Sequence, residues 1–390
     1  MKTSIAHAVL GSRRVCRRGS ILVLAAVLMI VILAFTAFTV DIGYIAVTKA
    51  QLQNASDAAA MSAAAELPYG WGPGATYNES ETASASRTAA QDVAALNPAG
   101  GLDSVYVNGQ RDLRLGQAVW DSATNTWTKT WGVSPYNLVE VVARRDQGSS
   151  ANGDGSLNLF FAPVIGHDTA TLTTTSICAM PPAVGFRTPG NGQTVGVLPI
   201  ALDVETWDAM IAGSGPDTYS YNESTGAVVS GSDGIREVNL YPNGTTALPP
   251  GNRGTVDFGP SNNSTSDLSR QICNGLNASD LSYFGGELRF DQVPLVLNGD
   301  TGLSAGIKDD LTSIKGIPRA IPLFSQVSGP GNNAMYTIVR FVGIRILDVK
   351  LTGGSKYVMV QPAPLVDSNT IPGTGSITSD TIFGPPALIQ

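Results

Sequence analysis

The chain has 390 residues, of which 43% are hydrophobic and only 14% are charged, and its formal net charge is −7. The apolar content excludes general disorder, and the length leaves room for roughly two or three folded units. A sparsely charged, acidic chain is a poor binder of the phosphate backbone of nucleic acids. We therefore expect no nucleic-acid partner.

An apolar run of twenty residues, Ile21 to Val40, follows a basic stretch that ends in Arg17-Arg18-Gly19. A charge-free run of this length is a candidate membrane-spanning helix, because about 20 residues at 1.5 Å each cover the roughly 30 Å hydrocarbon layer. Arginine is enriched before the run and not after it, and the positive-inside rule then places residues 1–19 in the cytoplasm. We expect a single-pass protein of the cytoplasmic (inner) membrane, bound to its lipid, with an extracytoplasmic C-terminal region. The arginines before the run are Arg13, Arg14, Arg17 and Arg18.

A cleaved secretory signal is the alternative interpretation of this N-terminus. The run is longer than the usual hydrophobic region of about 7–15 residues in a signal peptide. Its small-residue cleavage option, Ala34 to Ala37, lies inside the run. These features favour an uncleaved signal anchor.

Asp41 is the first charged residue after the apolar run. Its Cα lies about 30 Å along the helix from Ile21, at the outer interface, where a carboxylate costs much less than at the bilayer centre. We expect a wetted carboxylate that marks the exit from the membrane. The alternative is that Asp41 pairs with a partner helix inside the membrane.

The helical pattern continues beyond Asp41, which predicts an anchor with a helical extension over residues 20–67. A second helix is predicted over Ser80–Leu96, with Ser80 as its N-cap and Asn97-Pro98 as its stop. Both helices carry a stripe at helical spacing, and the side chains of the first stripe become small toward its end, so we predict an antiparallel pair; the alternative is that each helix packs on a sheet. The stripes are Ile45, Thr48, Leu52, Ala55, Ala59 and Ser62 in the first helix and Ala83, Ser86, Ala90 and Val93 in the second.

The N-terminal stretch carries a resemblance to a known family. The order Arg-Arg-Gly, apolar run, Asp41-Ile42-Gly43 and then Gln51-Leu52-Gln53-Asn54-Ala55-Ser56-Asp57-Ala58-Ala59-Ala60 resembles the N-terminal domain of TadG-like proteins of tight-adherence (Flp) pilus assembly. The resemblance covers about the first 65 residues. It implies a bacterial single-pass envelope protein, with a large extracytoplasmic domain, that acts in the assembly or anchoring of an adhesive pilus.

Two features of some relatives are missing from this chain. Pseudopilin-type relatives carry Glu five residues after a processed glycine, whereas the chain has Leu24 at that distance from Gly19, which argues against peptidase processing. Members with a von Willebrand A-type domain carry a D-x-S-x-S metal motif, and this sequence has none.

Residues 68–182 are expected to form an extracytoplasmic α+β region that includes the helix pair. The segment Leu157–Ile165 predicts a short helix that faces the sheet, although Pro163 disturbs it. Pro181-Pro182 marks the predicted domain boundary. The strands are expected at Asp103–Asn108, Leu113–Trp120, Trp127–Trp131, Leu138–Arg144 and Thr169–Ala179, with a turn at Asp121–Asn125.

Residues 183–390 are expected to form a larger β-rich domain, a sandwich or a barrel, because short strand-like segments alternate with Gly, Pro, Asn and Ser clusters. The apolar majority of Ile338–Val349 predicts a long strand near the centre of the sheet. Two helices are expected, Glu205–Ile211 and Asp267–Leu276, the second capped by Ser266. The strands are expected at Thr194–Leu202, Gly226–Ser230, Glu237–Tyr241, Arg319–Phe324, Tyr336–Val349 and Tyr357–Gln361.

Catalytic patterns are weak in this sequence. Gly302-Leu303-Ser304-Ala305-Gly306 matches the G-x-S-x-G pattern of serine hydrolases, but that order needs a histidine after the serine, and the two histidines, His7 and His167, precede it. We interpret His167 as a capping or surface residue. The carboxylates at Asp309-Asp310 and in Gly231-Ser232-Asp233-Gly234 are interpreted as a solvated helix start and a hairpin turn, with weak calcium binding as the alternative.

Metal, cofactor and redox sites are not expected either. Two histidines and three scattered cysteines provide no zinc spacing, and Gly329-Pro330-Gly331-Asn332-Asn333 lacks the Lys-Ser/Thr of a phosphate loop. A disulfide between Cys178 and Cys273 is possible, but burial as two separate small apolar residues is favoured. We therefore predict no catalytic, cofactor-binding or metal-binding residues and no small-molecule substrate.

These expectations favour a membrane-anchored structural or assembly protein of a Flp pilus or a related surface apparatus, with pilus-assembly or envelope proteins as partners. One alternative is an extracellular adhesin or carbohydrate-binding module, for which Trp207, Tyr219 and Tyr221 could supply an aromatic surface. Another is an envelope enzyme with an unrecognised site, which would show convergent polar groups in a deep pocket.

Overall fold

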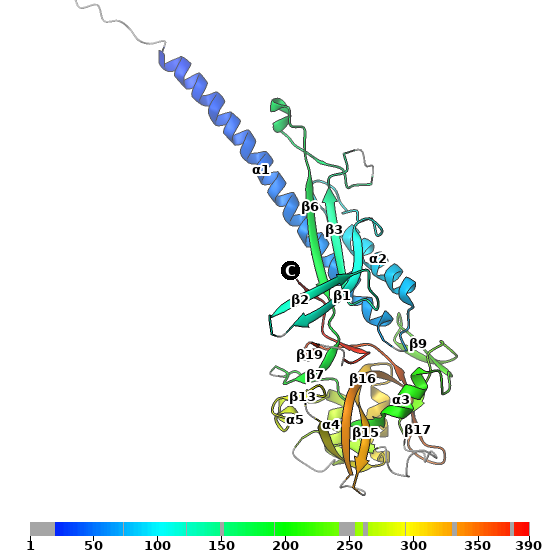
Figure 1. Ribbon diagram of the computed structural model, residues 1–390. Helices are drawn as coiled ribbons and strands as arrows, with labels where there is room; N and C mark the ends of the chain where they lie inside the picture. Colours follow the sequence, from blue (N-terminus) through cyan, green and yellow to red (C-terminus); the bar gives the residue numbers. More distant parts are fainter. Residues whose placement is uncertain are drawn as a thin grey trace, which may run out of the picture.

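The computed structural model describes residues 20–389, apart from 73, 122, 149–151, 191, 242–253, 260–263, 293, 330–333 and 375–377. It shows a long helix that projects from a helix-and-sheet region, below which lies a larger β-rich body (Figure 1). The fold is α+β, as the sequence predicts. The basic segment 1–19, Cys16 and the glycine-rich stretch after Gly329 lie outside the described residues.

The N-terminal helix α1 extends without interruption over Ser20–Ala65, 46 residues. Its sequence has no proline, and its one glycine, Gly43, leaves the helix intact. The helix ends just before Pro68, which lies in the short 3-10 helix η1, Leu67–Gly70. The expected apolar run and its helical extension are therefore one continuous rod of about 69 Å at 1.5 Å per residue.

The second helix α2 extends over Glu79–Ala95 and packs antiparallel to the second half of α1. Its N-cap is Asn78 and not Ser80, because the Asn78 side chain accepts from the Glu81 backbone while the Glu81 carboxylate accepts from the Asn78 backbone. Near the turn, the Ser86 hydroxyl donates to the Ala63 carbonyl at 3.0 Å. The far end of the pair is closed by Gly100 after α2, whose N–H donates to the Gln51 side chain of α1 at 3.0 Å.

The first sheet has five strands in the order β2-β1-β3-β6-β21, with antiparallel neighbours throughout. It packs on the second half of α1 through β3 and β6, so α1 contacts both a helix and a sheet. Strand β21 comes from the C-terminus, which returns to pair with β6. The strands are β1 Leu113–Asp121, β2 Thr126–Trp131, β3 Leu138–Arg145, β6 Leu172–Ala179 and β21 Ala387–Leu388.

Two expectations for this region are wrong. Residues 103–108 are extended but join no sheet; their alternating Val105 and Val107 are buried in the first core, and the Val107 carbonyl accepts from Gln91 of α2. Residues 157–165 do not form a helix that faces the sheet. They form the short strand β4, Leu157–Asn158, paired with β5, Thr169–Ala170, and between them the exposed 3-10 helix η2, Ala162–Ile165.

The β-rich body is built on a seven-stranded sheet in the order β11-β17-β16-β14-β12-β8-β15. Strand β15 pairs with β8 in parallel and also with β16 antiparallel, so five strands close into a barrel-like ring. The long strand β16, Ala334–Lys350, pairs with β14, β15 and β17 and is central, as predicted. The other strands of this sheet are β8 Ile200–Asp203, β11 Val238–Asn239, β12 Gly254–Val256, β14 Leu295–Thr301, β15 Pro318–Ser328 and β17 Tyr357–Pro362.

Short helices and ladders surround this sheet. The predicted helices are present as α3, Val204–Ile211, and α4, Thr265–Asn274, although α4 is capped by Ser264 and not by Ser266. The remaining helices are α5 Ala278–Ser282, α6 Lys308–Ser313 and the 3-10 helix η3 Ala305–Ile307. The remaining strands are β7 Ala183–Arg187, β9 Tyr219–Asn222, β10 Ala227–Ser230, β13 Glu287–Arg289, β18 Leu365–Val366, β19 Thr370–Pro372 and β20 Ile382–Phe383.

Three large hydrophobic clusters form the cores. The first lies between α1, α2 and the first sheet, and Phe383 from the C-terminal part of the chain belongs to it. The other two belong to the β-rich body, one around Trp207 and the other around Phe341. The first half of α1 contributes to none of them, which directs attention to that segment.

Candidate membrane-exit site

The first half of α1 displays an apolar surface that the described chain leaves largely exposed. Its large hydrophobic side chains between Ile21 and Val40 are 42–75% exposed. Among the described residues, α1 is the one helix long and apolar enough to cross a membrane, and the most apolar part of that span is entirely unburied. The core helix of a soluble protein would be covered by its own fold. The exposed surface of α1 fits single-pass anchoring in a bilayer.

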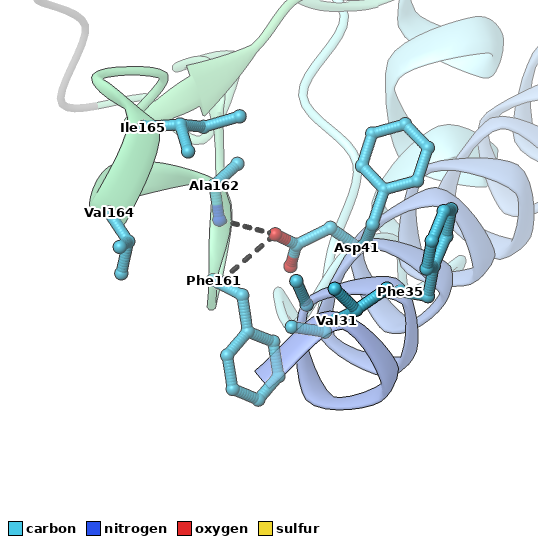
Figure 2. A pocket seen from close by; sticks show the side chains of 10 residues that line it. Val31, Phe35, Asp41, Phe161, Ala162, Val164 and Ile165 are labelled. Carbon is cyan, nitrogen blue, oxygen red and sulfur yellow. Dashed lines mark hydrogen bonds between the residues drawn. The ribbon is translucent and has the colours of Figure 1, made fainter. Parts of the chain in front are cut away.

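The Asp41 carboxylate lies where this apolar segment ends, and it is not wetted as we expected. The residue is 3% exposed and accepts hydrogen bonds from three consecutive backbone N–H groups, of which Figure 2 draws those of Phe161 and Ala162. Its Oδ1 accepts from Phe160 at 2.9 Å, and its Oδ2 accepts from Phe161 at 3.0 Å and from Ala162 at 2.6 Å. The alternative of a partner helix is not what engages Asp41 in this structure, because the acceptor oxygens are taken by the chain's own loop.

Of these three N–H groups, that of Ala162 belongs to the first residue of η2, that of Phe161 to its N-cap position and that of Phe160 to the residue before it. The N-cap position of η2 is Phe161, whose side chain supplies no capping hydrogen bond. Asp41 therefore performs the role of an N-cap from a different segment of the chain. A carboxylate is also the favoured charge at the N-terminal end of a helical turn. The bond ties the end of the apolar segment to the loop between β4 and β5.

An apolar groove of about 530 Å³ lies between α1 and this loop. Figure 2 shows Val31 and Phe35 on the helix side, and Phe161, Val164 and Ile165 on the loop side. The Asp41 carboxylate lies at one end, with its oxygens turned toward the loop backbone. The remaining residues of the lining are Ala34, Ala37, Phe38 and Ala162.

The Ala-rich segment Gln51–Ala60 attaches the second half of α1 to the sheet and to α2. The Ser56 hydroxyl is buried and lies 2.7 Å from the Ser176 hydroxyl and 3.3 Å from that of Thr174, both on β6. Gln53 donates to Ser176 at 3.0 Å and to Asp57 at 2.8 Å, and Ser176 donates to Asp57. The buried small side chains on this face are Ala55, Ala59 and Ala60. The segment therefore combines close backbone approach with a fully paired polar seam.

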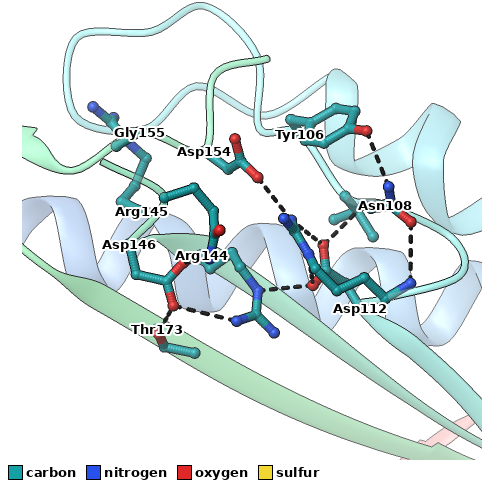
Figure 3. A network of polar contacts seen from close by, with 12 residues as sticks. Tyr106, Asn108, Asp112, Arg144, Arg145, Asp146, Asp154, Gly155 and Thr173 are labelled. Atoms are coloured by element: carbon teal, nitrogen blue, oxygen red, sulfur yellow. Dashed lines mark hydrogen bonds and ion pairs between the residues drawn. The ribbon is translucent and has the colours of Figure 1, made fainter. Parts of the chain in front are cut away.

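A network of ion pairs holds the loops at one end of the first sheet (Figure 3). Asp112 is buried and accepts from Arg111 at 2.7 Å and from Arg144 at 2.7 Å. Arg111 also reaches Asp154 at 2.7 Å. The carboxylates around the Arg111 guanidinium raise its pKa above the ordinary value, chiefly through the hydrogen bond that Arg111 donates to Asp112. Each charge of the network has a partner of opposite sign, so we interpret it as a structural clamp on the loops.

The residues that the sequence marked as weak catalytic candidates have structural roles. Ser304 of the G-x-S-x-G pattern caps η3 by accepting from the Gly306 N–H. His167 is exposed, and its backbone N–H donates to the Ala162 carbonyl. Within the described ranges, no group of three or more His, Cys, Asp or Glu residues is placed to hold a metal ion.

The carboxylate clusters lie at a helix start, as expected, and in a turn after β10 that is not the expected hairpin turn, because β10 pairs with β9 and the next strand, β11, pairs with β17. Asp309 and Asp310 lie in the first turn of α6. The segment 231–234 closes a turn in which the Asp217 side chain accepts from the N–H groups of Asp233 and Gly234.

The cysteine and aromatic candidates need two corrections. Cys178 and Cys273 form no disulfide; Cys178 is buried, as expected, but Cys273 is exposed. Trp207 is 2% exposed in the body core and supplies no surface for carbohydrate. Tyr221 lies under the Arg345 guanidinium, 3.5 Å from ring centroid to Cζ, and the Tyr219 hydroxyl donates to Asp348. The three aromatic residues are part of the packing of the body.

A family model matches the N-terminal part of the chain. Residues 19–66 match the model described as "Putative Flp pilus-assembly TadE/G-like" (Tad). No curated protein and no solved structure matches the chain. The matched residues are those of α1, including the exposed apolar half, Asp41 and the seam around Ser56. The N-terminal segment of this chain is therefore a Tad domain of the Flp pilus-assembly TadE/G-like type.

Proposed function

We propose that this protein is a single-pass anchor of the cytoplasmic (inner) membrane and a structural or assembly component of a Flp pilus or related surface apparatus. The N-terminus lies inside, and the region after α1 lies outside. The observation that carries the proposal is α1 itself: one unbroken helix is bare and apolar in its first half and buried in a folded domain in its second half. The Tad match over the same residues supports the pilus context.

The mechanism is mechanical. Beyond Asp41, α1 continues for the 24 residues 42–65, which is about 36 Å at 1.5 Å per residue. This half is clamped by α2 on one side and by β3 and β6 on the other. A pull on the body is therefore transmitted to the membrane segment through a packed helix and not through a flexible linker. The proposed partners are pilus-assembly or envelope proteins that contact the β-rich body.

The proposed domain organisation follows from this mechanism. We assign 1–19 to a cytoplasmic segment, 20–67 to the anchor and its extension, 68–182 to the α+β region, and 183–390 to the β-rich domain. A catalytic role is not part of the proposal, because the sequence-marked serine and histidine have capping and surface positions.

Piliation of the host provides the test. A host strain that lacks this protein is complemented with the full chain, or with a variant in which residues 21–40 are replaced by a cleavable signal peptide that releases residues 41–390. We expect surface Flp pili to be lost on deletion and restored only by the full chain. Normal piliation in the deletion strain would contradict the assembly role, and restoration by the released form would contradict the need for the anchor.

A further inference from the structure

The loop between β4 and β5 presents an exposed apolar tip. Val164 is 88% exposed, Ile165 70%, Phe160 64% and Phe161 46%. The segment 157–166, Leu-Asn-Leu-Phe-Phe-Ala-Pro-Val-Ile-Gly, contains no charged residue. A contiguous exposed patch of this kind usually marks a surface that contacts something apolar.

The tip lies beside the part of α1 that would be in the membrane. It faces Val31–Phe38 across the groove, and these residues belong to the second half of the apolar run. Val31 lies about 15 Å along the helix from Asp41. If the run Ile21–Val40 crosses the hydrocarbon layer, the groove and the loop tip lie in its outer half.

The backbone N–H groups of the loop have acceptors within the protein. Between 159 and 167 the chain has eight backbone N–H groups, since Pro163 has none. Three of them donate to Asp41, and those of 159, 164, 166 and 167 donate to backbone carbonyls. The eighth, of Ile165, lies inside the 3-10 turn. An unpaired N–H is costly in lipid, so this pairing lowers the cost of placing these donors in the hydrocarbon layer.

The aromatic pair of Tyr44 and Phe160 also fits an interface position. Tyr44, one turn beyond Asp41 on α1, contacts Phe160 with ring centroids 5.0 Å apart. Tyrosine is enriched where the hydrocarbon layer meets the headgroups. Phe160 and Tyr44 would then mark the outer boundary, with Val164 and Ile165 deeper than Phe160.

We propose that residues 159–166 form a second membrane contact, which inserts beside α1 so that outer-leaflet acyl chains fill the groove between them. The occupant is lipid because the groove is continuous with the lipid-facing surface of α1. A single helix can tilt and rotate in a bilayer, whereas a helix and a loop joined through Asp41 fix the orientation of the body. This inference rests on the anchoring of α1 proposed above.

Fluorescence quenching in vesicles tests the inference. The full chain, carrying Cys16→Ser and Cys273→Ser, is reconstituted alone into phosphatidylcholine–phosphatidylglycerol vesicles. Cys178 stays silent because it is buried. A single environment-sensitive fluorophore is attached to Val164→Cys. Two further sites serve as references: Leu28→Cys on the apolar half of α1, and Val229→Cys in the β9–β10 hairpin of the body, whose native residues are 57% and 52% exposed.

Quenchers on the lipid acyl chains and in the water distinguish the outcomes. We expect labels at 28 and 164 to be quenched by acyl-chain nitroxides and protected from iodide, and the label at 229 to show the reverse. If 28 is protected but 164 is quenched by iodide like 229, the loop inference is overturned and the anchor stands. If 28 is also open to iodide, the anchoring fails and the inference falls with it. A label at 164 that neither quencher reaches would place protein in the groove and overturn the choice of lipid.

Discussion

One carboxylate joins two segments that lie about 120 residues apart in the chain. Asp41 ends the apolar half of α1, and its oxygens pair with the backbone N–H groups of residues 160–162. Because Asp41 is buried, water cannot easily replace it as the acceptor, and buried N–H donors without partners lower stability. The same carboxylate therefore lies at the end of the apolar segment and holds the loop between β4 and β5 against α1.

Asp41→Ala should free the three N–H groups, and Asp41→Asn, which keeps one carbonyl oxygen, should have a smaller effect. Amide hydrogen exchange of residues 160–162 in the detergent-solubilised full chain is the measurement, and we expect faster exchange in the order Ala, Asn, wild type. Asp168→Asn removes the same charge from an exposed position nearby and should leave exchange unchanged. Equal exchange in Asp41→Ala and wild type would show that the cap does not hold the loop.

A second carboxylate makes the body sensitive to pH. Asp257 follows β12, and burial raises the pKa of its carboxyl, helped by the nearby Asp267, Asp300 and Asp280 carboxylates. Because the pKa of Asp257 is higher in the folded state than in the unfolded state, the protonated carboxyl favours the folded state. Its contribution to the free energy of unfolding is complete below the unfolded pKa of about 4. It is lost as pH rises through the folded pKa.

Asp257→Asn should therefore remove part of the loss of stability above about pH 4. Urea denaturation of the detergent-solubilised chain, repeated from acid to neutral pH, measures this. Asp309→Asn, at a 97% exposed side chain in the first turn of α6, is the matched control and should keep the wild-type slope. If the free energy of unfolding of Asp257→Asn depended on pH as in the wild type, the raised pKa of Asp257 would be contradicted.

The position of Asp41 at the end of the apolar run could be predicted from the sequence, but its partner could not. Backbone N–H groups are present at every residue except proline, so no side-chain pattern marks residues 160–162 as donors. Local capping was predictable only in part: Ser80 and Ser266 are chemically suitable caps, but Asn78 and Ser264 fill those roles.

The two halves of the single helix α1 have different surroundings: the first half is exposed and apolar, and the second half is packed in the folded domain. In its second half, small residues allow α2 and β6 to approach closely, and Ser56 meets hydroxyls of β6. The sequence posed helix pairing and sheet packing as alternatives, whereas α1 does both, because its buried surface is wide enough for two neighbours. The predicted stripe residues Thr48, Leu52, Ala55 and Ala59 are all buried.

Ala90→Leu tests the packing of the helix pair. Ala90 is fully buried in the first core, and extra methylene groups in a well-packed site cost about 1–3 kcal/mol. We expect a lower free energy of unfolding of that size in urea. Ala95→Leu, at an exposed position at the end of the same helix, should be nearly neutral. Equal stability of the two variants would contradict close packing at Ala90.

The strand prediction for residues 103–108 failed because a segment can bury alternate side chains without pairing with another strand. Residues 103–108 alternate like a half-buried strand, yet Val105 and Val107 are buried in the core beside α2 without a partner strand. By contrast, β16 was recognisable because its apolar run is long, and a central strand is covered on both faces.

In the whole molecule, the long helix α1 and the first sheet carry the β-rich body. The C-terminus returns to the first sheet through β21, so both ends of the β-rich body are connected to that sheet. The sequence predicted the order of anchor, helix pair and β-rich region. It could not predict the ring closure through β15 or the return of β21, because long-range strand pairing leaves no local pattern.

The most direct test of this architecture uses the native cysteines in intact bacterial spheroplasts, with a membrane-impermeant maleimide followed by alkaline carbonate extraction. Cys178 is silent because it is buried, and burial raises the pKa of its thiol to about 12. We predict that exposed Cys273 is labelled before lysis and that the labelled chain stays in the membrane pellet, whereas a Cys273→Ser chain is labelled at Cys16 only after lysis. Labelling of Cys273 only after lysis, or a labelled chain in the carbonate supernatant, would contradict the anchored, outward-facing arrangement.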